Sequence, residues 1–387
     1  MTLVRLQIAV DKNVFMSDFR LTDLAKSLPA TVPFVGPETQ ERMLKRPFLA
    51  RLGANESVFG PSPKAIEAMA GADHWKYGDP ENHDLRHAIA DHMGATASNI
   101  VVGEGIDGLL GYLVRLFVGA GDAVVTSEGA YPTFNYHVAG FGGVLHKVPY
   151  DAKDRENPKA LFSQAAKVGA KLVYLANPDN PMGTVWTGDE IKGFLDLLPA
   201  RSLLVLDEAY LECAPAGTSP GILWDDPRLI RMRTFSKVYG MAGARVGYGI
   251  GHPDLITAFN KLRNHFGVTR AAQDGALAAL QDHDWLERVQ AQIETARLKI
   301  GEIAKSNGVQ AIPSATNFVA IDCGQDGAFA KRVLEAVNDG GVFVRMPFVA
   351  PQNRCIRVSC GTPQDLDHFA KVLPGALAQA RSSAFRV

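Results

Sequence analysis

The sequence predicts an α/β protein, with a large three-layer α/β/α domain around a mostly parallel sheet and a smaller α+β domain. Between residues 99 and 234, short apolar runs of strand length alternate with helical segments or loops, as in parallel sheets covered by helices. These runs are almost continuously apolar, which is typical of strands buried on both faces. After Gly251 the helical pattern dominates, and residues 317–387 alternate between strand and helix once more.

The elements are expected in the following order. The first fifty residues contain four prolines, too many for a long helix, and predict an N-terminal arm lying across another part of the chain. Strands are expected at Asn99–Gly103, Ala123–Thr126, Val144–Pro149, Lys171–Ala176, Leu203–Leu206, Leu229–Thr234, Phe318–Asp322, Val342–Arg345 and Cys355–Ser359. Helices are expected at Ile106–Val118, Tyr131–Gly140, Pro253–His265, Ala271–Asp282 and Trp285–Asn307. The expected division is an arm at 1–50, a large domain at 51–280 and a small C-terminal domain at 281–387.

Composition narrows the class of protein. The 387 residues are 47% apolar and 21% charged, as in ordinary globular proteins. The formal net charge of −1 argues against a nucleic-acid binder with a broad basic surface. No apolar run approaches the roughly 18–20 residues that cross a bilayer, and the N-terminus lacks a secretion signal. The four cysteines form no Cys-x-x-Cys pair, so we expect a cytoplasmic protein without a metal site.

A glycine-rich turn follows the first expected strand. The run Gly103-Glu104-Gly105-Ile106-Asp107-Gly108 fits the G-x-G-x-x-G pattern of dinucleotide sites, and Glu128 could serve as the ribose ligand. The physical basis of the pattern is wider, because free N–H groups at a helix N-terminus bind any phosphate. A plain strand-to-helix turn without a ligand is the third interpretation. We favour a phosphate site over a dinucleotide site.

A second loop lies at the end of another expected strand. Asn177-Pro178-Asp179-Asn180-Pro181-Met182-Gly183-Thr184 can form neither helix nor strand. It is either a surface turn or a binding loop at the carboxyl edge of the sheet, where open α/β sheets bind ligands. In the second case Asn180 could offer its amide to a ligand oxygen.

Asp207 ends the apolar run Leu203–Leu206 and precedes Glu208. Carboxylates at strand ends are often solvated or cap a helix. The position of Asp207, however, predicts burial at the carboxyl edge of the sheet. A carboxylate there needs a cation or N–H donors to offset its loss of hydration.

Lys237 follows the expected strand Leu229–Thr234 in a loop of small residues. A lone lysine is usually a solvated surface residue. This loop has few other charges, and it offers the hydroxyls of Thr234 and Ser236 and, eight positions on, Arg245. Lysine amines with reduced hydration are nucleophiles suited to Schiff-base chemistry.

Arg357 stands inside the otherwise apolar strand Cys355–Ser359. It could pair with a buried acid of the protein. A fixed guanidinium also suits the carboxylate of a substrate.

Together these motifs resemble the fold-type I pyridoxal-phosphate aminotransferases, whose fold is aspartate-aminotransferase-like, and within them the histidinol-phosphate aminotransferase branch. The resemblance covers nearly the whole chain after residue 50, and five motifs occur in the family's order. They are Asn55-Glu56-Ser57-Val58-Phe59-Gly60-Pro61-Ser62-Pro63, Asn180-Pro181-x-Gly183, Asp207-Glu208-Ala209-Tyr210, Ser236-Lys237 with Arg245, and Arg357 before Gly361.

The resemblance implies pyridoxal 5'-phosphate as cofactor and a role for each motif. Lys237 would form the Schiff base, and Asp207 would pair with the protonated pyridine nitrogen. Asn180 and Tyr210 would hydrogen-bond the phenolic oxygen, and Tyr131 would stack on the ring. The phosphate shell would comprise Gly105, Ile106, Asp107, Thr234, Ser236 and Arg245.

The resemblance also implies a homodimer with shared active sites, because Tyr77 resembles the tyrosine that reaches the phosphate from the partner subunit. Arg357, Arg345 and Asn55 would bind an anionic substrate, with Arg263 as a third cation. The implied reaction moves an amino group between an anionic donor, such as histidinol phosphate or glutamate, and a 2-oxo acid such as 2-oxoglutarate. The segment Arg263–Gly267 departs from the branch, which puts histidinol phosphate itself in doubt.

Three alternatives stay open. A lyase, decarboxylase or oxidase of the same fold would use the same Lys237 and Asp207. A nicotinamide-dependent dehydrogenase would explain the glycine motif but not Lys237, Asp207 or Arg357. A non-catalytic ligand-binding domain would keep the phosphate cradle without needing the lysine.

Overall fold

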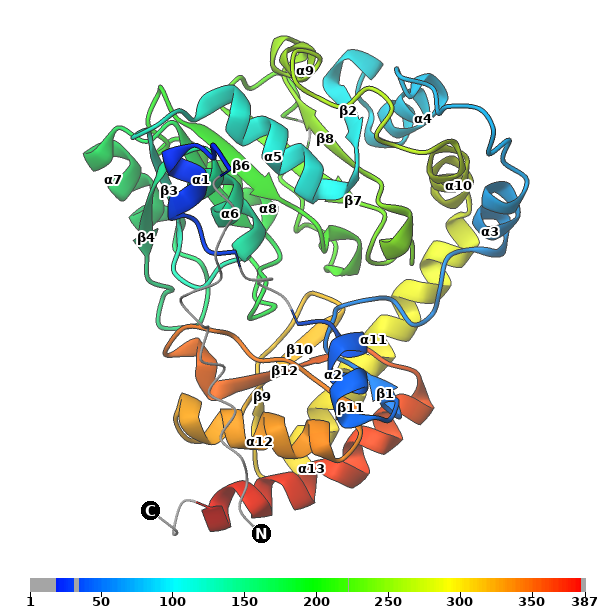
Figure 1. Cartoon of the computed structure of the whole chain (residues 1–387), viewed down its shortest axis with the longest axis vertical. Helices are drawn as coiled ribbons and strands as arrows, with labels where there is room; N and C mark the ends of the chain where they lie inside the picture. Colours follow the sequence, from blue (N-terminus) through cyan, green and yellow to red (C-terminus); the bar gives the residue numbers. More distant parts are fainter. Residues whose placement is uncertain (1–18, 31–34, 222, 384–387) are drawn as a thin grey trace.

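The computed structural model describes residues 19–30, 35–221 and 223–383, and they form two lobes (Figure 1). The larger lobe holds a seven-stranded sheet in the order β2-β8-β7-β6-β5-β3-β4. β8 runs antiparallel to both neighbours and the other strands are parallel. The strands are β2 Ile100–Gly103, β3 Ala123–Ser127, β4 Val144–Val148, β5 Leu172–Ala176, β6 Leu203–Asp207, β7 Leu229–Thr234 and β8 Gly247–Gly251.

Helices cover both faces of this sheet because successive strand residues point to opposite sides. Tyr174 and Val205 pack in one core cluster with α5 Gly105–Phe117, α6 Pro132–Gly140 and α9 Pro253–Phe259. Leu175 and Leu206, their sequence neighbours, pack in another with α7 Pro158–Val168 and α8 Gly188–Leu195. A third cluster joins β2 and β8 to the helices α3 Pro63–Ala70, α4 His83–Met93 and α10 Arg270–Gln281.

The smaller lobe is an α+β unit. Its antiparallel sheet has the order β12-β10-β9, and a parallel pair joins β1 to β11. Its elements are β1 Ala50–Arg51, α11 His283–Ser306, β9 Gln310–Ala311, β10 Phe318–Asp322, α12 Gly327–Asp339, β11 Val342–Phe343, β12 Cys355–Ser359 and α13 Pro363–Ser383.

Short 3-10 helices occur in both lobes, at Ala97–Asn99, Leu211–Cys213, Ala242–Ala244 and Gln352–Arg354. Among the described residues, none of the helices is of a length and apolar character that would span a membrane.

The predicted α/β class is confirmed, and the differences lie in individual elements. β8 was missed because three of its five residues are glycines. A Cβ at Gly249 would lie only 3.1 Å from Val101 Cγ1 and 3.3 Å from Met232 Sδ. The absence of a side chain at this position therefore lets β8 pack closely between β2 and β7. The predicted strand Val342–Arg345 ends at Phe343. The helix expected at Pro253–His265 ends at Phe259.

The expected irregular arm contains two helices. α1 Asp23–Ser27 lies near the large lobe, where Leu24 approaches Gly142. α2 Pro37–Leu44 lies on the small lobe, where Glu38 and Glu41 pair with Arg51 (Figure 1). Pro37 does not break α2, because proline is well tolerated at the first position of a helix. The expected path of residues 1–18 and 31–34 lies outside the described residues, and the division at 50 and 280 remains our proposal.

A buried charge cluster supports the carboxyl end of β6. Glu208 contacts Arg231 through Nη2 at 2.8 Å and Nε at 2.9 Å, and its Oε2 lies 3.0 Å from Arg233 Nε. The side chains of Glu208 and Arg231 are both 1% exposed. Arg231 also packs against the ring of Trp224 at 4.8 Å. Because these charges are removed from water, each depends on its partner.

Replacing Glu208 with glutamine should therefore destabilise the protein strongly. The change leaves two buried guanidinium groups without their shared carboxylate, which typically costs about 3–5 kcal/mol. Guanidinium chloride denaturation of wild type and Glu208→Gln measures this loss. The matched control is Glu302→Gln, which breaks an exposed pair with Lys299 and should cost less than about 1 kcal/mol. Equal effects of the two changes would contradict the importance assigned to the cluster.

Candidate active site

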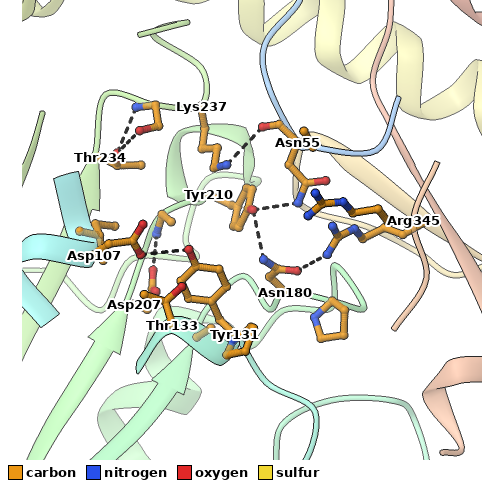
Figure 2. Close-up of a pocket in the computed structure, with 18 of the residues that line it drawn as sticks. Asn55, Asp107, Tyr131, Thr133, Asn180, Asp207, Tyr210, Thr234, Lys237 and Arg345 are labelled. Atoms are coloured by element: carbon orange, nitrogen blue, oxygen red, sulfur yellow. Dashed lines mark hydrogen bonds between the residues drawn. The ribbon is translucent and has the colours of Figure 1, made fainter. Parts of the chain in front are cut away.

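A cavity of about 480 Å³ lies between the two lobes, at the carboxyl ends of β5, β6 and β7 (Figure 2). The N-terminus of α5 and the segment after β7 bound it on the large lobe. Residues 54–56, 345–348 and Arg357 bound it on the small lobe. Open α/β sheets bind ligands at this edge because the strands end there and the loops diverge.

Lys237 reaches the cavity from the turn that follows β7. Ser236 N–H donates to Thr234 Oγ1 at 3.0 Å, and Gly240 N–H donates to the Lys237 carbonyl at 2.9 Å, so the turn is well defined. Lys237 Nζ donates to the carbonyl of Asn55 at 3.2 Å and lies 5.3 Å from the centre of the Tyr210 ring. No acid of the described residues forms an ion pair with it. The amine is therefore presented to a ligand beside an aromatic wall.

Asp207 stands at the floor of the cavity, where β6 ends. It is 5% exposed and accepts hydrogen bonds from Tyr174 Oη and, at 2.9 Å, from Ala209 N–H. Burial raises the pKa of Asp207 to about 6, although these two donors favour the ionised form. No ion pair to Asp207 occurs within the described residues, so a cationic group of a ligand would stabilise this carboxylate.

An anion cradle occupies the other end of the cavity. Gly105 begins α5 with φ +72°, and a Cβ there would lie 2.6 Å from Arg245 Nη2, so the guanidinium lies directly against the backbone. Arg245 Nη1 lies 3.5 Å from Ser236 Oγ, which in turn accepts from Thr234 Oγ1 at 2.9 Å. Asp107 lies 3.5 Å from Arg245 Nη2. The helix N-terminus, hydroxyls and guanidinium suit a phosphate.

Amide and hydroxyl groups connect the remaining walls. Tyr210 Oη accepts from Asn55 Nδ2 at 3.0 Å and from Asn180 Nδ2 at 3.4 Å, and Arg357 Nη1 donates to Asn180 Oδ1 at 2.6 Å (Figure 2). Asn55 has the left-handed φ of 56° and is held there by Ser359, whose Oγ accepts from Asn55 N–H at 3.0 Å. The network orients several polar groups toward one point.

Arg357 and Arg345 come from the small lobe, and their backbones bridge each other through hydrogen bonds of 2.6 and 3.2 Å. Burial lowers the pKa of Arg357 to about 10 and also lowers that of Arg345. Neither forms an ion pair with an acid in the described part of the chain, and Arg357 Nε is buried without a hydrogen-bond partner. Guanidinium groups in this state call for an anionic ligand.

Tyr131 immediately precedes α6 and donates its hydroxyl hydrogen to Asp107 Oδ1 at 3.0 Å. Burial, reinforced by the charge of Asp107, raises the pKa of the Tyr131 hydroxyl, which therefore stays protonated. Its ring lines the cavity beside Thr133 (Figure 2).

The structure thus brings nearly all predicted site residues to one cavity. Those that line it are Asn55, Ile106, Asp107, Tyr131, Asn180, Asp207, Tyr210, Thr234, Ser236, Lys237, Arg245, Arg345 and Arg357. Gly105 lies behind Arg245 at its edge. Tyr77 does not line it; its side chain is 78% exposed, and its ring contacts that of Phe266 at a tilt of 42°. Arg263 was expected as a third cation, but it lines a separate hollow of about 130 Å³.

Tyr174 and Thr133 are among the lining residues that were not predicted from the sequence. Tyr174 lies in the middle of β5, whose residues are all buried. The only signal in the sequence was its hydroxyl group, which needs a hydrogen-bond partner when the strand is buried. Thr133 follows Tyr131 and Pro132 at the start of α6, and no pattern distinguished it from a helix-capping residue.

Comparisons with known proteins agree with this geometry. Residues 49–373 match the family model of the class I and II aminotransferases. A histidinol-phosphate aminotransferase of Nitrosococcus oceani is 35% identical over 336 residues, which are 86% of this chain and 90% of that protein.

Solved structures show the same relationship. The histidinol-phosphate aminotransferase of Sinorhizobium meliloti, in complex with pyridoxal-5'-phosphate, is 51% identical with a TM-score of 0.91 over 94% of this chain and 99% of its own. An aspartate aminotransferase of Thermus thermophilus shares the fold, with a TM-score of 0.79 at 21% identity over 92% and 99% of the two chains.

The raised pKa of Asp207 predicts a pH-dependent contribution to stability in ligand-free protein. Between about pH 4 and 6 the folded state binds more protons than the unfolded state, because the unfolded pKa is about 3.9. The contribution is fully present below pH 4 and is lost as the pH rises through about 6. Asp207→Asn removes this titration. Its free energy of unfolding relative to wild type should therefore rise by on the order of 2–3 kcal/mol from pH 4 to pH 7. A difference that stays constant between these pH values would refute the assignment.

Proposed function

The chain belongs to the class I and II aminotransferases, and on this premise we propose a pyridoxal-phosphate-dependent transaminase of the histidinol-phosphate type that uses anionic amino donors. The observation that carries the proposal is the arrangement of three groups in one cavity. The Lys237 amine, the buried Asp207 carboxylate and the anion cradle at Gly105 lie around the same space.

These groups fit the cofactor. The cradle of Gly105, Ser236 and Arg245 would hold its phosphate, since a helix N-terminus, a hydroxyl and a guanidinium lie together there. Asp207 would face the pyridine nitrogen, whose positive charge supplies the partner that the carboxylate lacks within the chain. When bound, pyridoxal phosphate withdraws electrons from the donor's Cα and so makes its proton acidic.

The residues of the chain then hold and move protons around that centre. The free amine of Lys237 would take the proton from the donor's Cα as general base and would deliver it, as general acid, to the C4′ carbon of the cofactor. Tyr174 donates a hydrogen bond to Asp207, which favours the ionised carboxylate that would hold the pyridine N–H. Asn180 and Tyr210 would fix the ring through its phenolic oxygen, and Tyr131 would cover one face.

Arg357 and Arg345 would bind the acidic group of the substrate, with Asn55 alongside. The two guanidiniums have no acid partner in the described residues, which favours an anionic donor over a neutral amine. Histidinol phosphate and glutamate are the candidate donors, and 2-oxoglutarate is the candidate acceptor. The family assignment favours transamination over the lyase, decarboxylase and oxidase outcomes. The dehydrogenase alternative leaves Lys237 and Asp207 without a role.

We further propose a homodimer whose subunits complete each other's sites. Trp75, Tyr77 and Phe266 are 81%, 78% and 52% exposed, an unusual concentration of aromatic side chains on one surface. Arg270 donates to the Tyr77 carbonyl at 2.8 Å and so holds this segment in place. A second copy covering this surface would bring Tyr77 to the partner's phosphate. The four cysteines are all free and buried, which fits a cytoplasmic enzyme.

The first test concerns Lys237. Lys237→Ala should fold and bind pyridoxal phosphate noncovalently, but lose at least about a thousandfold in turnover, because no other lysine of the described residues lines the cavity to move the proton. Turnover with glutamate and 2-oxoglutarate, and the absorbance of the bound cofactor, measure the two effects. Lys171→Ala removes a surface lysine and is the control. Near-normal turnover in Lys237→Ala would refute the mechanism.

The second test separates the substrate's acidic group from its amine. Arg357→Ala should lower kcat/KM for histidinol phosphate and glutamate by about 10- to 100-fold, the loss of a charge-assisted contact. It should change kcat/KM for histidinol, which lacks the phosphate, by much less. Arg345→Ala should show the same selectivity, and Arg263→Ala, in the separate hollow, should not. If histidinol is the better donor in wild type and neither arginine matters, the anionic-substrate proposal is wrong.

The third test concerns assembly. Mixed dimers of Lys237→Ala and Tyr77→Phe chains should regain activity, because one of the two sites then has both residues intact, provided that each single variant is impaired. Activity after co-refolding of the two inactive chains measures this, with each chain refolded alone as the control. A monomer at working concentration by light scattering would contradict the shared site.

A further inference from the structure

A group of charged side chains joins the two lobes beside the cavity and has no part in the chemistry above. Asp154 lies between β4 and α7, and Arg354 immediately precedes β12. Arg354 Nη2 lies 2.7 Å from Asp154 Oδ2 and Nη1 lies 3.1 Å from Oδ1. Arg354 Nε also lies 2.7 Å from Asp322 Oδ2, and Gln352 Nε2 donates to Asp154 Oδ1 at 3.1 Å. We call Asp154, Asp322, Gln352 and Arg354 the interlobe clamp.

On the large lobe, the clamp is tied to the loop that carries Asn180. Asp154 has the left-handed φ of 57°, and its carbonyl accepts from Thr184 Oγ1 at 3.0 Å. The carbonyl of Glu156 accepts from Trp186 Nε1 at 2.9 Å. The segment that follows Asn180 therefore moves with the Asp154 loop.

On the small lobe, the clamp is tied to the strand that carries Arg357. Arg354 lies three residues before Arg357. Its carbonyl accepts a hydrogen bond from Cys323 N–H at 3.1 Å. β12 then pairs with β10 over its whole length, with Ala320 opposite Arg357. The position of Arg354 thus determines where β12 enters the site.

We propose that the interlobe clamp is a positioning device that holds Arg357 against Asn180 in the orientation required to bind the substrate's acidic group; the inference rests on the proposed function. Arg357 has no acid within the described chain to hold it, and its contact to Asn180 Oδ1 at 2.6 Å crosses the boundary between the lobes. A two-point guanidinium–carboxylate contact fixes orientation as well as distance. The side chain of Arg354 is 25% exposed and that of Asp154 is 13% exposed, so water screens this ion pair only in part.

The test compares Asp154→Asn, Arg354→Met and the double variant. In each, KM for glutamate and the Kd for succinate, a dicarboxylate that cannot react, should rise roughly three- to tenfold. kcat and the affinity for pyridoxal phosphate should stay within about twofold, because the cofactor residues lie on the large lobe. The double variant should be no worse than Arg354→Met, since that single change already removes the contact to Asp154 together with the contact to Asp322. Arg354→Lys keeps the charge without the two-point contact and should be intermediate.

The matched control is Lys171→Met, which removes an ion pair of 2.7 Å with Asp122 inside the large lobe and should leave KM and the succinate Kd unchanged. Unchanged values in the clamp variants would overturn the proposal. So would parallel losses in kcat, cofactor affinity and melting temperature, which indicate general destabilisation. If wild type fails to transaminate but Asp154→Asn still weakens succinate binding, the clamp stands and the proposed reaction is wrong.

Discussion

The burial of the Asp207 carboxylate at the end of β6 is the constraint on which the rest of the site depends. Removal from water raises its pKa to about 6, and the donors from Tyr174 and Ala209 offset only part of that cost. A ligand with a positive charge at this point would offset the rest of the desolvation cost of the Asp207 carboxylate. The anion cradle at Gly105 and the amine of Lys237 lie around the same cavity, so the proposed cofactor would meet all three groups at once.

Desolvation acts in the opposite sense at the other side of the cavity. There the pKa of Arg357 falls to about 10 because a guanidinium is held away from water without an acid beside it. The cavity therefore has an uncompensated negative site at its floor and an uncompensated positive site at its small-lobe wall. On the proposed function, the pyridine nitrogen of the cofactor would face the negative site, and an anionic substrate would match the positive site better than a neutral amine would.

The sequence predicted those features that local pattern determines. Asp207, Lys237 and Asn180 follow apolar runs, so their place at the carboxyl edge of the sheet could be inferred from strand length and period. β8 could not, because the lack of a side chain at Gly249 is required by the close packing of Val101 and Met232, which lie in distant segments. Tyr174 and the clamp residue Asp154 were missed for the same reason: their partners are 33 and 200 positions away in the chain.

The groups assigned to the cofactor and those assigned to the substrate's acidic group lie on different lobes. The groups assigned to the cofactor come from α5 and from the ends of β5, β6 and β7, all on the large lobe, whereas Arg345 and Arg357 come from the small lobe. Changes in the small lobe can therefore alter the acidic group that is accepted without disturbing the proton chemistry at Lys237. The condition is that the boundary between the lobes stays fixed, because a guanidinium displaced by about 1 Å no longer makes a good two-point contact. On the proposed function, substrate selection would depend on interlobe contacts as well as on the residues that touch the substrate.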